Sequence, residues 1–309
     1  MKIVLLDPMK IFPEHQQELS QLGDFVTYDK APANKEEILE RVKDADVVIN
    51  FWVELPTDVV KEMSSVKLII MAASGYDWVD VDMATEKGVL IAHCPGHNAE
   101  SVAEHTIGLI LSASRHLRKA VNETYRGEWN SIAYQGVELK DKILGIVGYG
   151  HIGKRVGEIA ENGFNMNVQH VDSGSTSEDL DNLLQTSDVI SINAPLNEKT
   201  KGMINEDAFE KMKQDVVLVN TGRGAVIDES ALIKAIKSGK VYAAGLDTLS
   251  QEPPEKDNPL FGFDNVIITP HTAWNTKETD YNLSEQIVKI VKAFVEGSPV
   301  HIITEQSIK

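Results

Sequence analysis

Three charged residues of this chain, Arg223, Glu252 and His271, could together act on a carboxylic acid that carries a neighbouring carbonyl group. The planar guanidinium of Arg223 matches the two oxygens of a carboxylate. The imidazole of His271 can give or take a proton near neutral pH, and a carboxylate at Glu252 would favour its protonated form. Hydride transfer to a 2-keto acid needs a cation for the carboxylate and a proton donor for the carbonyl oxygen, with NAD as the hydride source.

Each of these residues also has an ordinary structural explanation. Arg223, within TGRGAVID, could cap a helix or form an ion pair, and Glu252 could be a solvated loop charge. His271 could be a structural histidine. Whether the three side chains lie close together depends on the strands and loops that carry them.

A glycine motif supplies the expected cofactor site. Gly148, Gly150 and Gly153 form G-x-G-x-x-G between an apolar strand at 142–147 and a helix that is predicted to end at Gly163. The first glycine allows the tight turn, the second lets the backbone approach a pyrophosphate, and the third lets the helix pack closely. The free amides of the helix N-terminus then point at the anion.

An acidic residue stands where the adenosine ribose is expected. A second strand at 167–171 ends at Asp172, 19 residues after Gly153, and a carboxylate there accepts the ribose 2′-hydroxyl. It also repels a 2′-phosphate, so NAD is favoured over NADP. The alternative is a solvated strand-end carboxylate or a helix cap. We interpret the motif and its spacing together as a cofactor site.

Composition limits the class of protein. The chain has 309 residues, of which 42% are hydrophobic and 25% charged, and this suits two globular domains. A formal charge of −17 repels nucleic acids and anionic membrane surfaces. The one cysteine, Cys94, excludes an intrachain disulfide and fits a reducing cytosol. We therefore expect a soluble, cytoplasmic protein with no nucleic acid or membrane partner and no metal site.

The first third of the chain alternates strands and helices. Apolar strands are predicted at 2–7, 25–28, 46–50, 67–71 and 89–93, and helices at 14–22, 35–42, 57–63 and 81–87. This alternation predicts a small doubly wound parallel sheet.

The second half repeats the pattern around the glycine motif. Further strands are predicted at 188–193, 216–220, 242–246 and 266–269, helices at 206–212, 230–237 and 277–295, and a polar connection at 173–182. Because ligands of open α/β sheets bind at the carboxyl ends of the strands, the three charged residues should gather at one sheet edge. The last helix is predicted to pack on the first domain. The expected domains are a substrate domain at 1–97 and 275–309 and a dinucleotide-binding domain at 98–274.

The segment 98–120 is predicted to be one long helix. Its apolar residues are too many for one stripe, so it should pack on two sides, as a connector between domains and as part of a subunit interface. The following loop at 122–136, with Trp129 and Tyr134, is expected to leave the body and wrap a partner. This predicts a homodimer.

The sequence resembles the D-isomer-specific 2-hydroxyacid dehydrogenases almost from end to end. The similar segments are NAESVAEHTIGLIL (98–111), GYGHIG (148–153), NTGRGAVID (220–228), AAGLDTLSQEPP (243–254) and ITPHTAWNT (268–276), in the order of that family. Trp274 in HTAW resembles the glycerate dehydrogenase and hydroxypyruvate–glyoxylate reductase branch. The resemblance implies α/β architecture, with a Rossmann NAD-binding domain inserted into a discontinuous, flavodoxin-like substrate domain. It also implies an NAD-dependent oxidoreductase that interconverts a small 2-keto acid and its D-2-hydroxy acid.

The resemblance implies roles for single residues as well. Arg223 would be the catalytic residue that binds the substrate carboxylate, His271 the acid/base, and Glu252 its partner. Cofactor contacts are implied at Ser74, Gly148, Gly150, His151, Ile152, Gly153, Asp172, Ala194, Thr221, Asp247, His271 and Trp274. Substrate contacts are implied at Trp52, Ala73, Ser74, Gly75, Arg223 and His271.

Two departures from the family pattern concern the substrate and the adenine. Ala73-Ser74-Gly75 stands where the family usually has Gly-x-Gly, so this loop could sit differently against a carboxylate. The connection after Asp172 is shorter than usual. The loops 50–55 and 71–77, which are expected to contact the substrate, contain no Lys or Arg, and this disfavours a phosphorylated substrate. The aromatic residues of these loops suggest a pocket for a small or apolar side chain of the substrate.

Two other functions stay open at this point. The fold family includes a transcriptional corepressor that senses NAD(H) without turnover, and the complete set of Arg223, Glu252 and His271 argues against that function. An enzyme of the same class could use NADPH. An Arg or Lys after the second strand would indicate NADPH, and Ser173-Gly174-Ser175 supplies neither.

Overall fold

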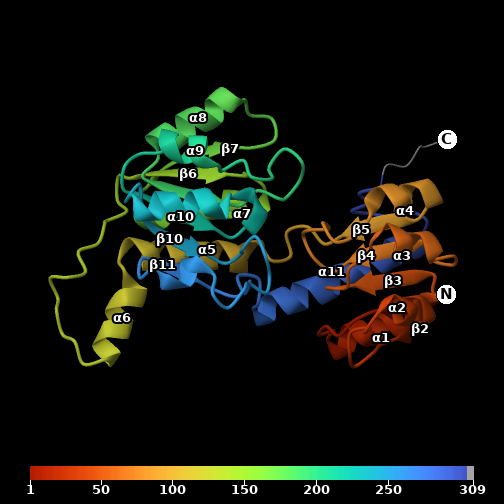
Figure 1. Cartoon of the computed structure of the whole chain (residues 1–309). Coiled ribbons are helices and arrows are strands. Elements are labelled where there is room, and N and C mark those ends of the chain that lie inside the picture. Colours follow the sequence, from red (N-terminus) through yellow and green to blue (C-terminus); the bar gives the residue numbers. More distant parts are fainter. Residues whose placement is uncertain (305–309) are drawn as a thin grey trace. The chain divides into compact units, whose positions relative to one another are not determined.

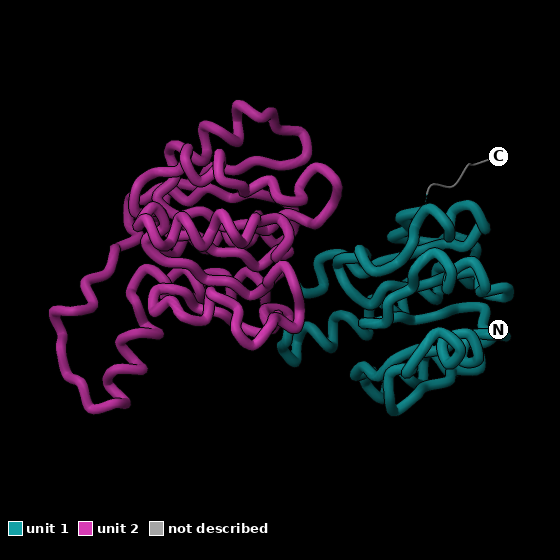
Figure 2. The backbone as a smooth tube through the Cα atoms, in the orientation of Figure 1, with its two compact units in different colours: residues 1–98, 275–309 teal, residues 99–274 magenta. Residues whose placement is uncertain are grey.

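A computed structural model describes residues 1–304 of the chain. The chain divides into two compact units, which we call unit 1 (residues 1–98 and 275–309) and unit 2 (residues 99–274) (Figure 2). Each unit is built around its own sheet. None of the helices described has both the length and the apolar character that a membrane crossing requires.

Unit 1 contains a five-stranded sheet in the order β2-β1-β3-β4-β5, with every neighbouring pair parallel. The strands are β1 (Lys2–Leu5), β2 (Asp24–Val26), β3 (Val47–Asn50), β4 (Leu68–Met71) and β5 (Leu90–His93). β3 and β4 are buried along their whole length, as expected for apolar strands that are covered on both faces.

The helices of unit 1 cover both faces of this sheet. They are α1 (Pro13–Leu22), α2 (Lys35–Val42), α3 (Thr57–Glu62), α4 (Val81–Lys87) and α11 (Lys277–Val295). Val4, Val48 and Ile69 form a core with α2, α3 and α4, whereas their strand neighbours belong to a core with α1 and α11. As predicted, α11 returns the chain to the first sheet, and it packs there against α1.

Unit 2 contains a six-stranded parallel sheet in the order β11-β10-β9-β8-β6-β7. The strands are β6 (Ile143–Val147), β7 (Asn167–Val171), β8 (Val189–Ile192), β9 (Val216–Asn220), β10 (Val241–Leu246) and β11 (Val266–Ile268). The strand order reverses at β6, which has β7 on one side and β8 on the other. β7 is an edge strand in this sheet, whereas the common order 3-2-1-4-5-6 places a third strand outside it.

Helices also cover both faces of the second sheet. They are α5 (Ala99–Ser114), α7 (His151–Phe164), α8 (Ser177–Thr186), α9 (Glu206–Lys211) and α10 (Glu229–Lys237). Unit 2 also contains α6 (Leu117–Tyr125), which has no buried residue, and the 3₁₀ turns η1 (Gly224–Val226) and η2 (Pro259–Gly262). One core contains α8, α9 and α10, and the other contains α5 and α7. The prediction of two doubly wound parallel sheets is therefore confirmed.

The prediction of a single helix at 98–120 is wrong. α5 ends at Ser114 and α6 begins at Leu117, because His116 has a φ of 48°, a left-handed conformation that ends a right-handed helix. The expected packing on more than one side is found for α5, which contacts α7 as well as β9 and β10.

The polar connection predicted at 173–182 is also wrong, because it contains most of α8. This helix begins with a capping box between Thr176 and Asp179. Its two fully buried apolar residues, Leu183 and Leu184, lie beyond the polar stretch, and only Leu180, which is partly buried, lies within it. The capping signal is present in the sequence, and the density of Ser and Asp obscures it.

The expected end of α7 at Gly163 is displaced by two residues. The helix continues through Gly163 to Phe164. Asn165, with a φ of 51°, adopts the left-handed conformation that ends it. Asn can replace Gly in this role because its short polar side chain tolerates that backbone conformation.

The arm, which we define as residues 126–136, extends from the end of α6 away from the sheet of unit 2 (Figure 1). Tyr125 and Trp129 are each 89% exposed, and Ile132 is 87% exposed. The hydroxyl of Tyr134, in contrast, donates a hydrogen bond to the Glu123 carboxylate of α6. The arm therefore presents large apolar side chains to solvent, which is typical of a surface that another molecule covers.

Candidate active site

The glycine turn after β6 has the form of a phosphate cradle. Gly148 has a φ of 95°, and a Cβ on it would lie 2.6 Å from the backbone nitrogen of Ala194. A Cβ on Gly153 would lie 2.1 Å from the carbonyl oxygen of Gly148, so α7 packs directly on the turn. A Cβ on Gly150 would meet no atom within 4 Å. The space in front of Gly150 and the first amides of α7 therefore fits a pyrophosphate group.

Asp172 is exposed at the end of β7. Its Oδ1 accepts a hydrogen bond from the backbone nitrogen of Gly174 at 2.9 Å, and its own amide donates to Ser175 Oγ at 3.0 Å. Two residues earlier, the ring of His170 stacks on Tyr149 of the glycine turn, with 3.6 Å between ring centroids. The turn after β7 thus holds the exposed Asp172 carboxylate in a fixed place near the cradle, where it suits a ribose hydroxyl.

Other residues implied as cofactor contacts border the same sheet edge. His151 and Ile152 are the first residues of α7, and Ala194 follows the end of β8 closely. Thr221 follows β9 directly and is 8% exposed. Its hydroxyl accepts a hydrogen bond from Asn193 Nδ2 at 3.0 Å, so this side chain already has a protein partner.

Arg223 and Glu252 are brought together by a close contact between the turn after β9 and the loop after β10. A Cβ on Gly224 would lie 1.9 Å from the carbonyl carbon of Leu249, so only glycine allows the two segments to approach this far. Asn220 Nδ2 donates to the carbonyl oxygen of Arg223 at 3.0 Å and holds the turn. The two elements therefore place a guanidinium and a carboxylate at the same sheet edge.

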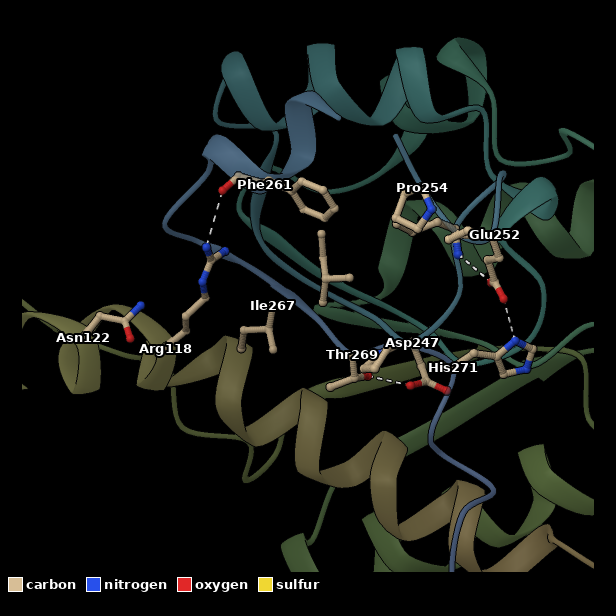
Figure 3. A pocket seen from close by; sticks show the side chains of 13 residues that line it. Arg118, Asn122, Asp247, Glu252, Pro254, Phe261, Ile267, Thr269 and His271 are labelled. Atoms are coloured by element: carbon tan, nitrogen blue, oxygen red, sulfur yellow. Dashed lines mark hydrogen bonds and ion pairs between the residues drawn. The ribbon is translucent and has the colours of Figure 1, made fainter. Parts of the chain in front are cut away.

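Glu252 and His271 form a direct pair, with 2.7 Å between Oε2 and Nδ1 (Figure 3). The amide of Leu249 donates to Oε1 of Glu252 at 3.0 Å. Burial alone would raise the pKa of Glu252. The hydrogen bond and charge of His271, the Leu249 amide and the charge of Arg223 outweigh burial and hold that pKa below its usual value. An ionised Glu252 fixes the imidazole ring through Nδ1 and directs Nε2 to the opposite side.

The turn that carries His271 is wrapped around Asp247. Oδ1 of Asp247 accepts hydrogen bonds from Thr269 Oγ1 at 2.5 Å and from the Thr272 amide at 2.9 Å, and Oδ2 accepts from the Ala273 amide at 2.9 Å. The Asp247 carbonyl accepts from the His271 amide at 2.8 Å. His271 has a φ of 52°, a strained conformation for a residue with a side chain. The contacts to Asp247 impose it.

Trp274 supports the same turn. Its Nε1 donates to the carbonyl oxygen of His271 at 2.9 Å, and its own carbonyl accepts from Ser101 Oγ of α5 at 3.4 Å. Both Asp247 and Trp274, which the resemblance implies as cofactor contacts, therefore also hold the position of His271.

A cavity of about 710 Å³ opens beside the Glu252–His271 pair (Figure 3). The loops after β10 and β11, η2 and α6 form its walls. Glu252 and His271 line one part of it, and Arg118 of α6 lines another. The guanidinium of Arg118 donates to the carbonyl oxygen of Phe263 at 2.9 Å and so ties α6 to the loop before β11.

The loop that the resemblance implies as a substrate contact in unit 1 contains Ala73, Ser74 and Gly75. It follows β4. The hydroxyl of Ser74 donates to Asn98 Oδ1 at 2.9 Å, and its carbonyl oxygen lies 3.0 Å from His93 Nδ1. Burial lowers the pKa of His93, which favours a neutral ring that donates through Nδ1. Both the side chain and the backbone of Ser74 are therefore anchored within unit 1.

Trp52 follows β3 in unit 1 and is 47% exposed. Its ring stacks on Trp78 with 5.7 Å between centroids. The amides of Phe51 and Trp52 donate to the two carboxylate oxygens of Asp7, both at 2.8 Å. Burial raises the pKa of Asp7, and these amides together with Arg41 oppose that rise.

Sequence patterns did not identify the residues that hold these loops. His105 of α5 contacts Thr269 and Asp247, but in the sequence it is one of several polar residues of that helix and carries no motif. Asp7 ends the first predicted strand, and this strand-end position is the same signal that marks Asp172. His93 ends β5 and carries no motif.

Comparison with known proteins agrees with this geometry. Residues 107–273 match the family described as "D-isomer specific 2-hydroxyacid dehydrogenase, NAD binding domain". The chain belongs to this family. The hydroxypyruvate reductase of Blautia hydrogenotrophica is 36% identical, over 99% of this chain and 100% of that protein.

Solved structures are similar over almost the whole chain. An acyclic imino acid reductase in complex with NADPH and D-Arg is 30% identical with a TM-score of 0.92, covering 98% of this chain and 100% of that chain. A D-lactate dehydrogenase from Aquifex aeolicus, complexed with NAD and lactic acid, is 31% identical with a TM-score of 0.85, covering 99% and 100%. The predicted family and enzyme class are confirmed: the protein is an NAD-dependent 2-hydroxyacid dehydrogenase.

Proposed function

We propose that this dehydrogenase reduces a small, unphosphorylated 2-keto acid to its D-2-hydroxy acid, with Arg223 binding the substrate carboxylate and His271 acting as acid/base. The observation that carries the proposal is the 2.7 Å contact between His271 and Glu252, on loops that also bring Arg223 close. The pair supplies an oriented proton donor, and Arg223 supplies a cation at the same sheet edge.

Each of these residues would have a separate role in the reaction. Arg223 holds the carboxylate through its planar fork, so that the neighbouring carbonyl group has one orientation. The glycine cradle and Asp172 would hold NADH, which would supply the hydride for the carbonyl carbon. His271 gives the proton from Nε2 to the carbonyl oxygen as negative charge develops there. Glu252 stabilises the imidazolium before transfer and keeps the ring oriented.

Hydroxypyruvate and glyoxylate are the proposed substrates. The similar protein from Blautia hydrogenotrophica is named hydroxypyruvate reductase. The loops 50–55 and 71–77 of unit 1, which we propose as part of the substrate domain, contain no Lys or Arg to bind a phosphate. The proposed substrate contacts there are Trp52, Ala73, Ser74 and Gly75.

The test measures oxidation of NADH with glyoxylate, hydroxypyruvate, pyruvate, phenylpyruvate and 3-phosphohydroxypyruvate, and repeats each assay with NADPH. We expect Arg223→Lys, which keeps the charge but loses the fork, to raise KM and lower kcat. His271→Ala should lower kcat by on the order of a hundredfold or more, with little change in KM. NADH binding without turnover of any keto acid would instead favour the sensor function, and an undiminished kcat in His271→Ala would remove that residue as acid/base.

We also propose a homodimer in which the arm contacts a second copy, and a cytosolic location, which the unpaired, buried Cys94 supports. Support for the dimer comes from the exposed Trp129 and Ile132. Sedimentation or light scattering should show a dimer for the wild type and for Glu128→Gln. The double change Trp129→Asp and Ile132→Asp should give a monomer, and a dimer unaffected by it would exclude the arm as the interface.

A further inference from the structure

The turn from Thr269 to Ala273 holds a strained residue and therefore needs support from outside itself. His271 has a φ of 52°, and such a conformation persists only where the surroundings impose it. Asp247 provides part of that support through its carboxylate and its carbonyl oxygen. Asp247 is only 2% exposed, and a buried carboxylate in turn needs donors of its own to keep its position.

A histidine on α5 completes this arrangement. Nε2 of His105 lies 3.0 Å from Thr269 Oγ1 and 3.5 Å from Asp247 Oδ1. Because the Thr269 hydroxyl donates its one proton to Asp247, its oxygen is left to accept a hydrogen bond from Nε2–H of His105. The order of donation is therefore from His105 to Thr269 and from Thr269 to Asp247.

Two other polar side chains of α5 contact segments of the candidate active site next to the His271 turn. Ser101 Oγ donates to the carbonyl oxygen of Trp274 at 3.4 Å, and Thr106 Oγ1 lies 2.8 Å from Thr221 Oγ1. Ser101, His105 and Thr106 are polar residues on a helix that is otherwise largely apolar and buried. α5 thus contacts the segments after β9, β10 and β11 through polar side chains.

We propose that His105 and Thr269 are positioning residues for the dehydrogenase reaction, which fix the His271 turn through Asp247 without touching the substrate. This proposal rests on the proposed role of His271 as acid/base. A misplacement of a catalytic group by about 1 Å can lower a rate by on the order of a hundredfold. The hydrogen bonds from α5 should therefore affect turnover more than substrate or cofactor affinity.

The experiment compares matched pairs of variants in the full-length enzyme. Thr269→Val removes the hydroxyl but keeps the shape, whereas Thr269→Ser keeps the hydroxyl. His105→Leu removes the donor, whereas His105→Gln can still donate from its side-chain amide to Thr269. For each variant we would measure kcat and KM for the best keto acid, the Kd for NADH and the thermal midpoint of unfolding.

We expect Thr269→Val and His105→Leu to lower kcat by on the order of tenfold, with KM and the NADH Kd within about twofold of wild type. Thr269→Ser and His105→Gln should recover most of that loss. A lower thermal midpoint with unchanged kcat in Thr269→Val would show a merely structural role and overturn the proposal. A Thr269→Ser enzyme as slow as Thr269→Val would overturn it as well.

His271→Ala, measured in the same series, separates this proposal from the proposed function. If His271→Ala keeps wild-type kcat, the acid/base assignment fails first, and the positioning proposal fails with it. If His271→Ala is slow but both Thr269→Val and His105→Leu are as fast as wild type, only the positioning proposal fails.

Discussion

The two sheets share the order of their first five strands, but they use the end of the first strand in opposite ways. In unit 1, β1 lies between β2 and β3, and in unit 2, β6 lies between β7 and β8, so the strand order reverses at both. Such a reversal leaves a crevice outside the carboxyl ends of the strands. After β1 the crevice is filled by the Asp7 carboxylate, which accepts the amides of Phe51 and Trp52. After β6 it is left open in front of Gly150.

This difference shows that the strand order creates the crevice, whereas the side chains at its edge decide whether it can bind a ligand. An internal carboxylate satisfies free backbone amides and closes the position to an external anion. Glycines without a side chain leave amides for a phosphate to satisfy. The same physical need, a partner for backbone N–H groups, is therefore met by the protein in unit 1 and is left for the proposed cofactor in unit 2.

The largest effect is expected when a side chain fills the open crevice at the glycine turn of unit 2. Gly150→Val adds a side chain where no atom lies within 4 Å, at a φ of −80° that valine adopts readily. We expect the NADH Kd to rise by on the order of a hundredfold, a loss of about 3 kcal/mol. Titration calorimetry measures the Kd, and circular dichroism should show an unchanged unfolding midpoint. NADH binding as tight as in wild type would exclude the cradle as the pyrophosphate site.

Opening the filled crevice of unit 1 should affect stability instead. Asp7→Ala removes the buried carboxylate that accepts hydrogen bonds from the amides of Phe51 and Trp52, which should lower the free energy of unfolding by about 2 kcal/mol. Chemical denaturation measures this loss. KM for the keto acid should also rise, because the loop that carries Trp52 is no longer fixed, while the NADH Kd stays unchanged. A stable variant with unchanged KM would contradict the anchoring role of Asp7.

Asp172 tests the preference for NAD at the outer end of the open crevice. Asp172→Ser removes the carboxylate from an exposed turn, so stability should not change. We expect KM for NADH to rise by about tenfold, which corresponds to about 1.4 kcal/mol, and KM for NADPH to fall. Steady-state kinetics with both cofactors measure the ratio. Asp172→Glu serves as the control that keeps the charge, and an unchanged ratio in Asp172→Ser would assign the preference to other residues.

The smallest expected effect concerns the far end of α7. Gly163 lies inside this helix, where a Cβ would meet no atom within 4 Å. Gly163→Ala should therefore raise the free energy of unfolding by about 1 kcal/mol. NADH binding should not change, in contrast to Gly150→Val, which lies directly before the first residue of the same helix. A destabilised Gly163→Ala would mean that the helix does not continue past this residue.

Particular residues show how far the sequence can be interpreted. The strand at 216–220 and the helix at 277–295 have the bounds that the sequence predicts, because each is one unbroken pattern of a single period. The break at His116 has only a weak signal in the sequence, since histidine is enriched among left-handed residues but adopts other conformations far more often. The capping box of α8 is a recognisable signal, but it lies among polar residues that usually indicate a loop.

The sequence by itself determined which chemistry is available. The glycine spacing, the acid at Asp172 and the residue types of Arg223, Glu252 and His271 follow from the chain alone, because they express local geometry and intrinsic side-chain properties. Tertiary structure decided how these groups are held. The contact of Gly224 with Leu249, the Asp247 carboxylate inside the His271 turn and the donation from His105 join segments far apart in the chain. No local pattern encodes such contacts, because they arise only when separate strands end at the same edge of one sheet.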